Sequence, residues 1–222
     1  MPRRVIDVGA SFSGNAKLCV LNKEVVTYIA LSHCWGSNLN ESPLKTLKAT
    51  LPTHLEDIPL SSLSRTFRDA IAFTRKLKIR YIWIDSLCIV QDDDMDWQHE
   101  IPKMGDIYRN CWLTLSAAKS ADGSGGLFTE STPGVPITFF DDGRETLFHA
   151  RRVFSDSAAY PNMDEHLDMK VDRMQHDTDF PLFFRGWVMQ ERYLSPRTLY
   201  FCASELIWEC SDKAQCECWG KP

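Results

Sequence analysis

The sequence lacks a long hydrophobic run, an excess of basic charge and a recognisable secretory signal peptide. No apolar stretch reaches the about 20 residues that span a membrane. Lys and Arg number 25 against 30 Asp and Glu, and this net charge of -5 argues against nucleic-acid binding, which usually requires a basic face. Asp7 and Gly9 interrupt the basic N-terminus, so no signal peptide is visible. We therefore expect a cytoplasmic protein with no membrane span and no nucleic-acid partner.

The eight cysteines do not form a disulfide or zinc pattern. Four of them lie in or beside apolar runs, where a free thiol behaves as a small hydrophobe: Cys34, Cys88, Cys111 and Cys202. Three more lie near the C-terminus: Cys210, Cys216 and Cys218. Zinc ligand pairs are usually separated by about two to four residues, whereas a single residue separates the last two. We expect free thiols, no metal site and no bound cofactor in a reducing compartment.

Strand-like and helix-like segments alternate over the first 130 residues. The apolar positions of the helix-like segments recur at helical spacing, and the strand-like segments are short apolar runs. The expected strands lie near residues 28–32, 81–84 and 111–117, and the expected helices span 63–77 and 96–109. Proline is tolerated only in the first turn of a helix, so Pro102 predicts that the second helix either begins near residue 100 or is kinked there. A strand, helix, strand order predicts a parallel crossover. The fold class is therefore α/β, with helices flanking a parallel sheet of at least three strands.

The remaining segments are mostly β-structure. Residues 37–60 form a connector in which a short helix near 44–51 is possible, and 154–181 read as a surface excursion. Further strands are expected in an N-terminal pair at 5–8 and 18–21, a hairpin at 136–140 and 145–150, and a closing pair at 198–202 and 206–210. A short helix over 184–194 precedes the closing pair.

Glu100 is the first candidate for chemistry. On a helical wheel it falls in the apolar arc of Trp97, Ile101, Met104 and Tyr108. A carboxylate among apolar groups is costly to ionise, and the raised pKa that results is common at catalytic sites. The alternative is a structural glutamate that stabilises the first turn of the helix, and from the residues alone this alternative is favoured.

A polar segment follows the strand at residue 28, comprising Ser32, His33, Cys34, Trp35 and Gly36. Loops at the carboxyl ends of parallel strands line the ligand sites of open α/β sheets, so we expect this segment to line a pocket. Asp85, at the end of the strand that follows, is expected there too. A thiol nucleophile is less favoured, because adjacent residues of an extended segment point to opposite sides and His33 would not activate Cys34.

The segment Arg185 to Arg192 holds the third candidate group. Trp187, Gln190 and Glu191 share one face of the expected helix. They could bind a ring and a hydroxyl group. They could equally dock the helix on the sheet, with Glu191 paired to an arginine. Both interpretations stay open.

Three blocks of the sequence carry a family resemblance. They are YIALSHCWG (28–36), YIWIDSLCIVQDD continuing to DWQHEIPKMGDIYRNC (81–111), and RGWVMQERYLSPRTLYF with LIWEC (185–210). In this order they resemble the HET domain of fungal heterokaryon-incompatibility proteins. The resemblance divides a single HET domain, 1–222, into lead-in strands (1–27), a core (28–130) and a part with a β-hairpin and the GWxxQE segment (131–222).

The resemblance implies a core similar to that of Toll/interleukin-1 receptor (TIR) domains, a flavodoxin-like parallel sheet. It implies a cell-death effector that hydrolyses NAD or NADP between nicotinamide and ribose, with Glu100 as the catalytic carboxylate. Trp97 or Trp187 would stack on a ring, and activation would involve a homo-oligomer. The alternative is a non-enzymatic signalling module that acts by self-association.

Overall fold

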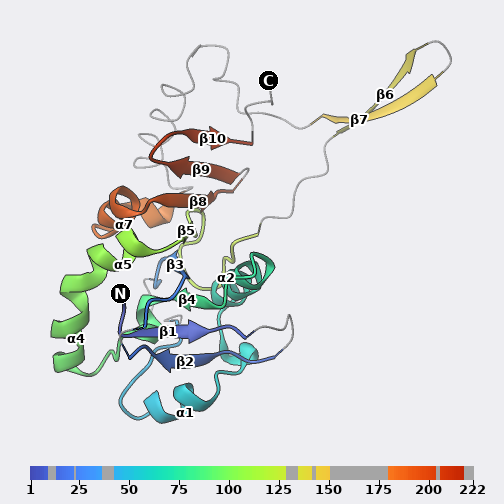
Figure 1. Cartoon of the computed structure of the whole chain (residues 1–222). Helices are drawn as coiled ribbons and strands as arrows, with labels where there is room; N and C mark the ends of the chain where they lie inside the picture. Colours follow the sequence, from blue (N-terminus) through green and yellow to red (C-terminus); the bar gives the residue numbers. More distant parts are fainter. Residues whose placement is uncertain are drawn as a thin grey trace.

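The computed structural model describes residues 1–9, 14–22, 24–36, 43–128, 135–141, 144–150, 180–203 and 206–217. One sheet contains β1 (Arg4–Asp7), β2 (Lys17–Val20), β3 (Tyr28–Ser32), β4 (Tyr81–Trp83), β5 (Leu113–Ser116), β8 (Arg197–Phe201), β9 (Leu206–Cys210) and β10 (Ala214–Cys216). These eight strands follow the order β10-β9-β8-β5-β3-β4-β1-β2 (Figure 1). A separate antiparallel hairpin joins β6 (Val135–Asp141) to β7 (Arg144–Ala150), as predicted.

The centre of the large sheet is parallel. β3 pairs with β4 and β5, and β5 pairs with β8. In chain order these strands are arranged second, first, third and fourth, which is the order of flavodoxin-like sheets. Such sheets bind ligands beyond the carboxyl ends of the strands, where the strand order reverses. That point lies here between β3 and β5, beyond Ser32 and Ser116, and the predicted α/β class with a parallel core is confirmed.

Antiparallel strands extend the sheet at both edges. β1 pairs with β4 and β2, so the predicted N-terminal strands form an edge hairpin. β8 and β9 form the predicted closing pair, and β10 adds to it. No strand is predicted from the sequence at residues 214–216. They form one because β9 offers its free edge within reach of a short turn.

The helices of the described residues are α1 (Leu51–Glu56), α2 (Arg65–Lys76), α3 (Asp85–Cys88), α4 (Asp94–Glu100), α5 (Met104–Asn110) and α7 (Val188–Leu194). The same ranges contain the short 3₁₀ turns η2 (Leu60–Ser62), η3 (Ile101–Lys103) and η5 (Pro181–Phe184). In Figure 1, α2 lies on the opposite side of the sheet from α4 and α5. No helix in the described ranges is both long and apolar enough to cross a membrane.

α2 forms where the sequence predicts a helix. Ser64 is its N-cap and accepts a hydrogen bond from the backbone N of Phe67 at 3.4 Å. Its buried face includes Phe67 and Ile71. Two basic residues, Arg75 and Lys76, lie in its last turn, where they complement the helix dipole.

The interruption that Pro102 predicts in the helix at 96–109 is present. The segment is divided into α4, η3 and α5, because Pro102 has no backbone N–H to continue the α-helical ladder. Two other local predictions need correction. The short helix expected near 44–51 begins at Leu51 instead, with Pro52 in its first turn, where proline is tolerated. Asp85 does not end a strand but opens α3. The excursion predicted at 154–181 lies outside the described residues except for its last two.

Candidate functional site

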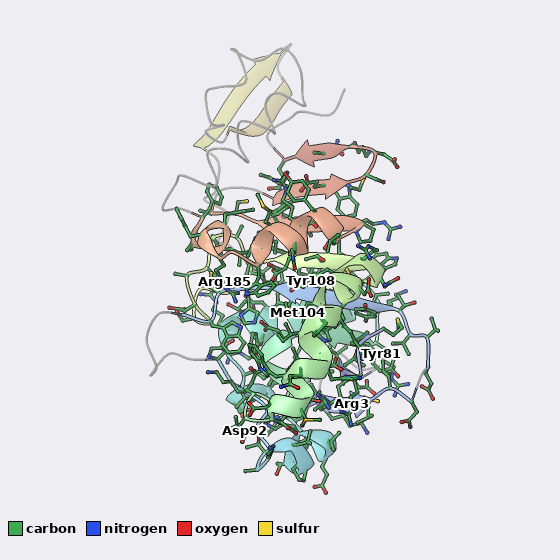
Figure 2. All side chains as sticks on the ribbon, turned by 90° about the vertical axis from the view of Figure 1, so that its left-hand side faces the viewer. Arg3, Tyr81, Asp92, Met104, Tyr108 and Arg185 are labelled. Atoms are coloured by element: carbon green, nitrogen blue, oxygen red, sulfur yellow. The ribbon has the colours of Figure 1, made fainter. Side chains whose placement is uncertain are left out.

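A cavity of about 210 Å³ lies beyond the carboxyl ends of β3 and β4. Segments that follow these strands meet α5 and α7 there, on the side that faces the viewer in Figure 2. The lining combines three indoles, two carboxylates, one guanidinium, one amide and three aliphatic side chains: Trp35, Trp97, Trp187, Asp85, Glu191, Arg185, Gln91, Ile89, Ile101 and Met104. The cavity therefore offers aromatic surfaces and charges of both signs.

Glu191 is a buried carboxylate in this wall. α7 carries it to the end of β3, where its side chain is 4% exposed and the Ser32 hydroxyl donates a hydrogen bond to Oε2. Burial raises the pKa of Glu191 to about 7; the negative charge of Asp85 acts in the same direction and the Ser32 hydrogen bond opposes it. Glu191 therefore exchanges a proton near neutral pH. Its partner is Ser32 and not the arginine that one sequence interpretation had suggested.

Asp85 is the second carboxylate, and it is fully engaged. Oδ1 lies 2.9 Å from His33 Nε2 and accepts a hydrogen bond from the Ser86 backbone N at 2.7 Å. Oδ2 accepts from Trp35 Nε1 at 2.9 Å. Burial opposes ionisation of Asp85, but the positive charge and hydrogen bond of His33, with further help from Arg185 and Trp35, hold its pKa below the usual range. Asp85 thus fixes the Trp35 indole in the cavity wall.

The last residue of β3 and the residues that follow it point in different directions. Ser32 reaches Glu191 on the side of α7, whereas the His33 ring packs edge-on against Phe67 of α2, with ring centroids 4.9 Å apart. Cys34 is buried and packs against Leu182 and Val188. Of the predicted segment, only Trp35 lines the cavity itself. Gly36 ends the described part of this segment with a φ of 87°, a left-handed conformation that glycine adopts without strain.

A cysteine nucleophile is not supported by the geometry. Burial raises the pKa of the Cys34 thiol to about 11 and that of the Cys88 thiol to about 12. The His33 ring contacts the backbone carbonyl of Cys34 at 3.1 Å, not its sulfur. A thiol is nucleophilic as the thiolate, and neither sulfur is in a position to ionise near neutral pH.

Glu100 lies outside the cavity lining. Its side chain is fully buried, Oε2 accepts from the Arg3 backbone N at 3.4 Å, and Oε1 lies 2.6 Å from His99 Nδ1 and 3.9 Å from Lys103 Nζ. These contacts correct the predicted arc, in which Glu100 shared a face with Trp97. At about 100° per residue, Glu100 is about 60° from Trp97, and the rotation turns it towards β1. Its contacts are those of a structural carboxylate.

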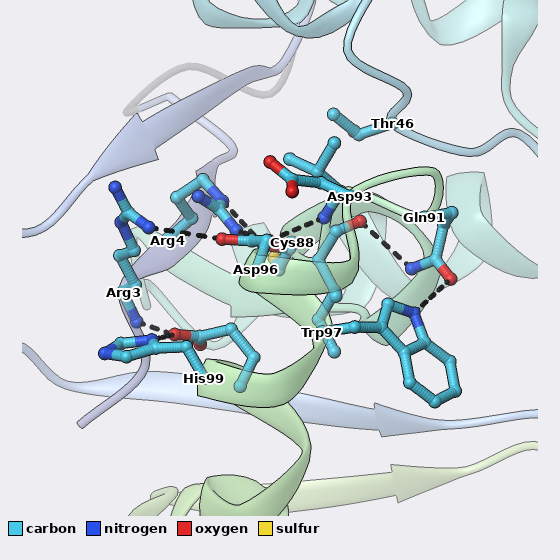
Figure 3. A network of polar contacts seen from close by, with 12 residues as sticks. Arg3, Arg4, Thr46, Cys88, Gln91, Asp93, Asp96, Trp97 and His99 are labelled. Atoms are coloured by element: carbon cyan, nitrogen blue, oxygen red, sulfur yellow. Dashed lines mark hydrogen bonds and ion pairs between the residues drawn. The ribbon is translucent and has the colours of Figure 1, made fainter.

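Opposite sides of α4 have different roles (Figure 3). Asp96 points to β1, where Arg4 forms a buried ion pair with Oδ2 and the Val90 backbone N donates to the same oxygen at 2.8 Å. Trp97 lies on the other side, where its indole N–H donates to Gln91 Oε1 at 3.4 Å. Docking of α4 on β1 therefore presents the Trp97 ring to the cavity.

The structure brings together five of the predicted site residues at the cavity wall: Trp35, Asp85, Trp97, Trp187 and Glu191. Ser32 and His33 contact the two carboxylates from behind. The sequence interpretation had not placed Gln91 in the site. The sequence signal that could have identified Gln91 is its position as the first polar residue after the apolar residues Ile89 and Val90. In the described part of the chain, no cluster of three or more His, Cys, Asp or Glu could hold a metal ion.

Comparison with known proteins gives one match. The family model described as heterokaryon incompatibility protein (HET) matches residues 28–191 of the 222-residue chain. No curated protein and no solved structure matches the sequence. The matched range begins at the first residue of β3 and ends at Glu191, so it contains every residue of the cavity wall. This protein belongs to the heterokaryon incompatibility (HET) family.

Proposed function

We propose that this HET domain hydrolyses the bond between nicotinamide and ribose in NAD or NADP, with Glu191 as the carboxylate at the reaction centre. The loss of NAD would connect non-self recognition to cell death. The observation that carries the proposal is the position of Glu191 in the wall of a cavity that also holds three indoles. Its contacts there are suited to this chemistry.

The free oxygen of Glu191 is the first support. Ser32 engages Oε2, and among the described residues none donates a hydrogen bond to Oε1. Oε1 is therefore available to a molecule in the cavity. A carboxylate at this position can accept a hydrogen bond from a ribose hydroxyl and stabilise positive charge that develops at the anomeric carbon.

The reaction needs one anion and no acid. When the bond between C1′ and the pyridinium nitrogen breaks, its electron pair goes to nitrogen and nicotinamide leaves as a neutral molecule. The ribose that remains is oxocarbenium-like, and the ionised Glu191 stabilises it. Water then adds to C1′ and releases a proton, which Glu191 can accept. Since the pKa of Glu191 is about 7, the reactive ionised form increases as the pH rises through neutrality.

The indoles supply the second support. Trp97 is 45% and Trp187 51% exposed, so both present ring surface to solvent. The nicotinamide ring of NAD is a cationic aromatic, and a cation over an indole face is attracted by the ring quadrupole. An indole also binds the neutral product less strongly, which favours its release.

The test measures nicotinamide release from NAD and from NADP by purified wild-type protein, Glu191→Gln and Glu100→Gln. We expect Glu191→Gln to lose at least about a hundredfold in rate, as loss of a catalytic carboxylate does. Glu100→Gln, provided that circular dichroism shows it folded, should keep most of the activity. Loss of activity only in Glu100→Gln would return the chemistry to Glu100 and overturn this assignment.

A second candidate is a signalling module that acts by self-association. Besides Trp187, three large side chains around α7 are more than half exposed and favour it: Phe184, Met189 and Tyr193. The same experiment separates the two functions. If wild-type protein releases no nicotinamide even when it is clustered at high concentration, the self-association function is favoured.

A further inference from the structure

Arg185 is a guanidinium in the cavity wall, where its positive charge favours the ionised forms of Asp85 and Glu191 and lowers the pKa of each. It lies between η5 and α7, where Nη1 donates a hydrogen bond to the backbone carbonyl of His33. Asp85 and Glu191 line the same cavity, but within the described ranges Arg185 makes no ion pair with either. A guanidinium has five N–H donors, and within the described residues that of Arg185 forms one hydrogen bond, from Nη1.

The carbonyl that holds Arg185 is itself held in place. His33 is 2% exposed; its Nε2 lies 2.9 Å from Asp85, and its ring packs against Phe67. The Arg185 backbone N donates to the Leu182 carbonyl at 3.2 Å. The guanidinium is thus oriented before any ligand arrives, which reduces the entropy lost on binding.

The charges that line the cavity differ in the ligand groups that they attract. The two carboxylates suit a cationic ring, but they repel a phosphate. An arginine with unengaged donors offers a planar fork that matches two phosphate oxygens. In a nicotinamide nucleotide, the 5′-phosphate is one ribose away from the glycosidic bond, and Arg185 and Glu191 line one cavity.

We propose that Arg185 binds the 5′-phosphate on the ribose whose glycosidic bond faces Glu191, so that the site takes nucleotides and discriminates against the corresponding nucleosides. This inference rests on the proposed function for the position of the ribose. It predicts that the site binds a nucleotide more tightly than the corresponding nucleoside, and that this preference requires Arg185.

The test measures binding, which does not require turnover. Nicotinamide mononucleotide and nicotinamide riboside differ only by the 5′-phosphate. Each is titrated into Glu191→Gln protein, which does not consume the probe, and quenching of tryptophan fluorescence reports occupancy. The same titrations are made with a double variant that carries both Glu191→Gln and Arg185→Gln. Arg109→Gln is the matched control, because Arg109 is exposed and paired with Asp106 at 2.8 Å.

We expect Arg185→Gln to weaken binding of the mononucleotide roughly ten- to a hundredfold, the value of a charge-assisted hydrogen-bond pair, and to leave the riboside within about twofold. The preference for the mononucleotide should also decrease as salt is added. Arg109→Gln should change neither affinity.

Three results would overturn the inference: equal weakening of both probes by Arg185→Gln, no change in either, or no binding of the mononucleotide to the protein that retains Arg185. Failure of the proposed function gives a different result. In that case wild-type protein releases no nicotinamide, while the preference for the mononucleotide and its dependence on Arg185 persist.

Discussion

The Ser32 hydroxyl donates a hydrogen bond to Glu191 Oε2 and thereby joins β3 to a helix 159 residues further along the chain. Ser32 ends the first strand of the parallel core, at the point where the strand order reverses. The bond holds one oxygen of the carboxylate and leaves the other to the cavity. The pKa of Glu191, and with it the pH range of the proposed reaction, depends on this contact.

Replacing Ser32 by alanine should move the pH dependence of nicotinamide release upward. The hydroxyl lowers the pKa of Glu191 by stabilising the ionised form, so its removal raises that pKa above about 7. A hydrogen bond to a charged group is worth roughly 1.5–3 kcal/mol, which corresponds to a shift of about one to two pH units. The measurement is the pH–rate profile, with Ser62→Ala, an exposed serine, as control. An unchanged midpoint would show that this hydrogen bond does not tune Glu191.

Glu191→Gln should stabilise the fold at alkaline pH. The folded-state pKa is raised from 4.5 to about 7, so the native protein binds more protons than the unfolded chain between these values. Wild-type stability therefore falls as the pH rises through this window, by roughly 3 kcal/mol if the full shift is expressed. Urea unfolding of both proteins at several pH values tests this. The free energy of unfolding of Glu191→Gln should exceed that of the wild-type protein at pH 8, and the difference should disappear towards pH 4.

Glu209→Gln provides a control of opposite sign. Burial opposes ionisation of Glu209, but its hydrogen bonds with Arg192, at 2.7 and 3.0 Å, and with the Tyr200 hydroxyl keep its pKa below the usual value. The contribution of ionised Glu209 to the stability of the fold is present above the pKa that Glu209 has in the unfolded chain, and it is lost as the pH falls. Glu209→Gln should therefore destabilise the protein at pH 8. Stabilisation by both variants would point to a general effect of removing charge.

Asp96→Asn should be strongly destabilising. Asp96 and Arg4 form a buried ion pair, each 4% exposed, and Asp96 also accepts from the Val90 backbone N. Removing one partner of such a pair leaves a buried charge unpaired and costs about 3–5 kcal/mol. Urea unfolding measures the loss. Asp106→Asn, which removes an exposed pair with Arg109, should change stability by less than about 1 kcal/mol. Similar effects of the two substitutions would contradict the role given to Asp96.

Cys34 should be inert to alkylation. Cys34 is 6% exposed, and burial raises the pKa of its thiol to about 11. Iodoacetamide at pH 8 should therefore label Cys34 slowly in the native protein and rapidly in urea, as mass spectrometry of peptides would show. Cys34→Ala should retain nicotinamide release. Fast native labelling, or loss of release in this variant with the fold intact, would revive a thiol mechanism.

Much of the fold could be predicted because its signals are local. The apolar spacing of α2 and the cap at Ser64 define that helix, and the short apolar runs at Tyr28, Tyr81 and Leu113 are strands in the expected parallel arrangement. Pro102 marks the break between α4 and α5. β10 was missed because its pairing depends on the position of β9 and not on a signal within residues 214–216.

The sequence by itself determined the family, the α/β class and a set of candidate side chains that includes Trp97, Trp187, Asp85 and Glu191. Only the tertiary structure decided which carboxylate faces the cavity. A helical wheel places Glu100 and Trp97 within about 60° of each other, and that difference matters only once the helix is docked. Contacts of Asp96 and Glu100 with Arg3 and Arg4, more than ninety positions away in the chain, turn Glu100 into the core. Long-range contacts of this kind are set by tertiary packing and leave no pattern in the local sequence. The periodicity of strands and helices, in contrast, depends on residues that are close together in the chain.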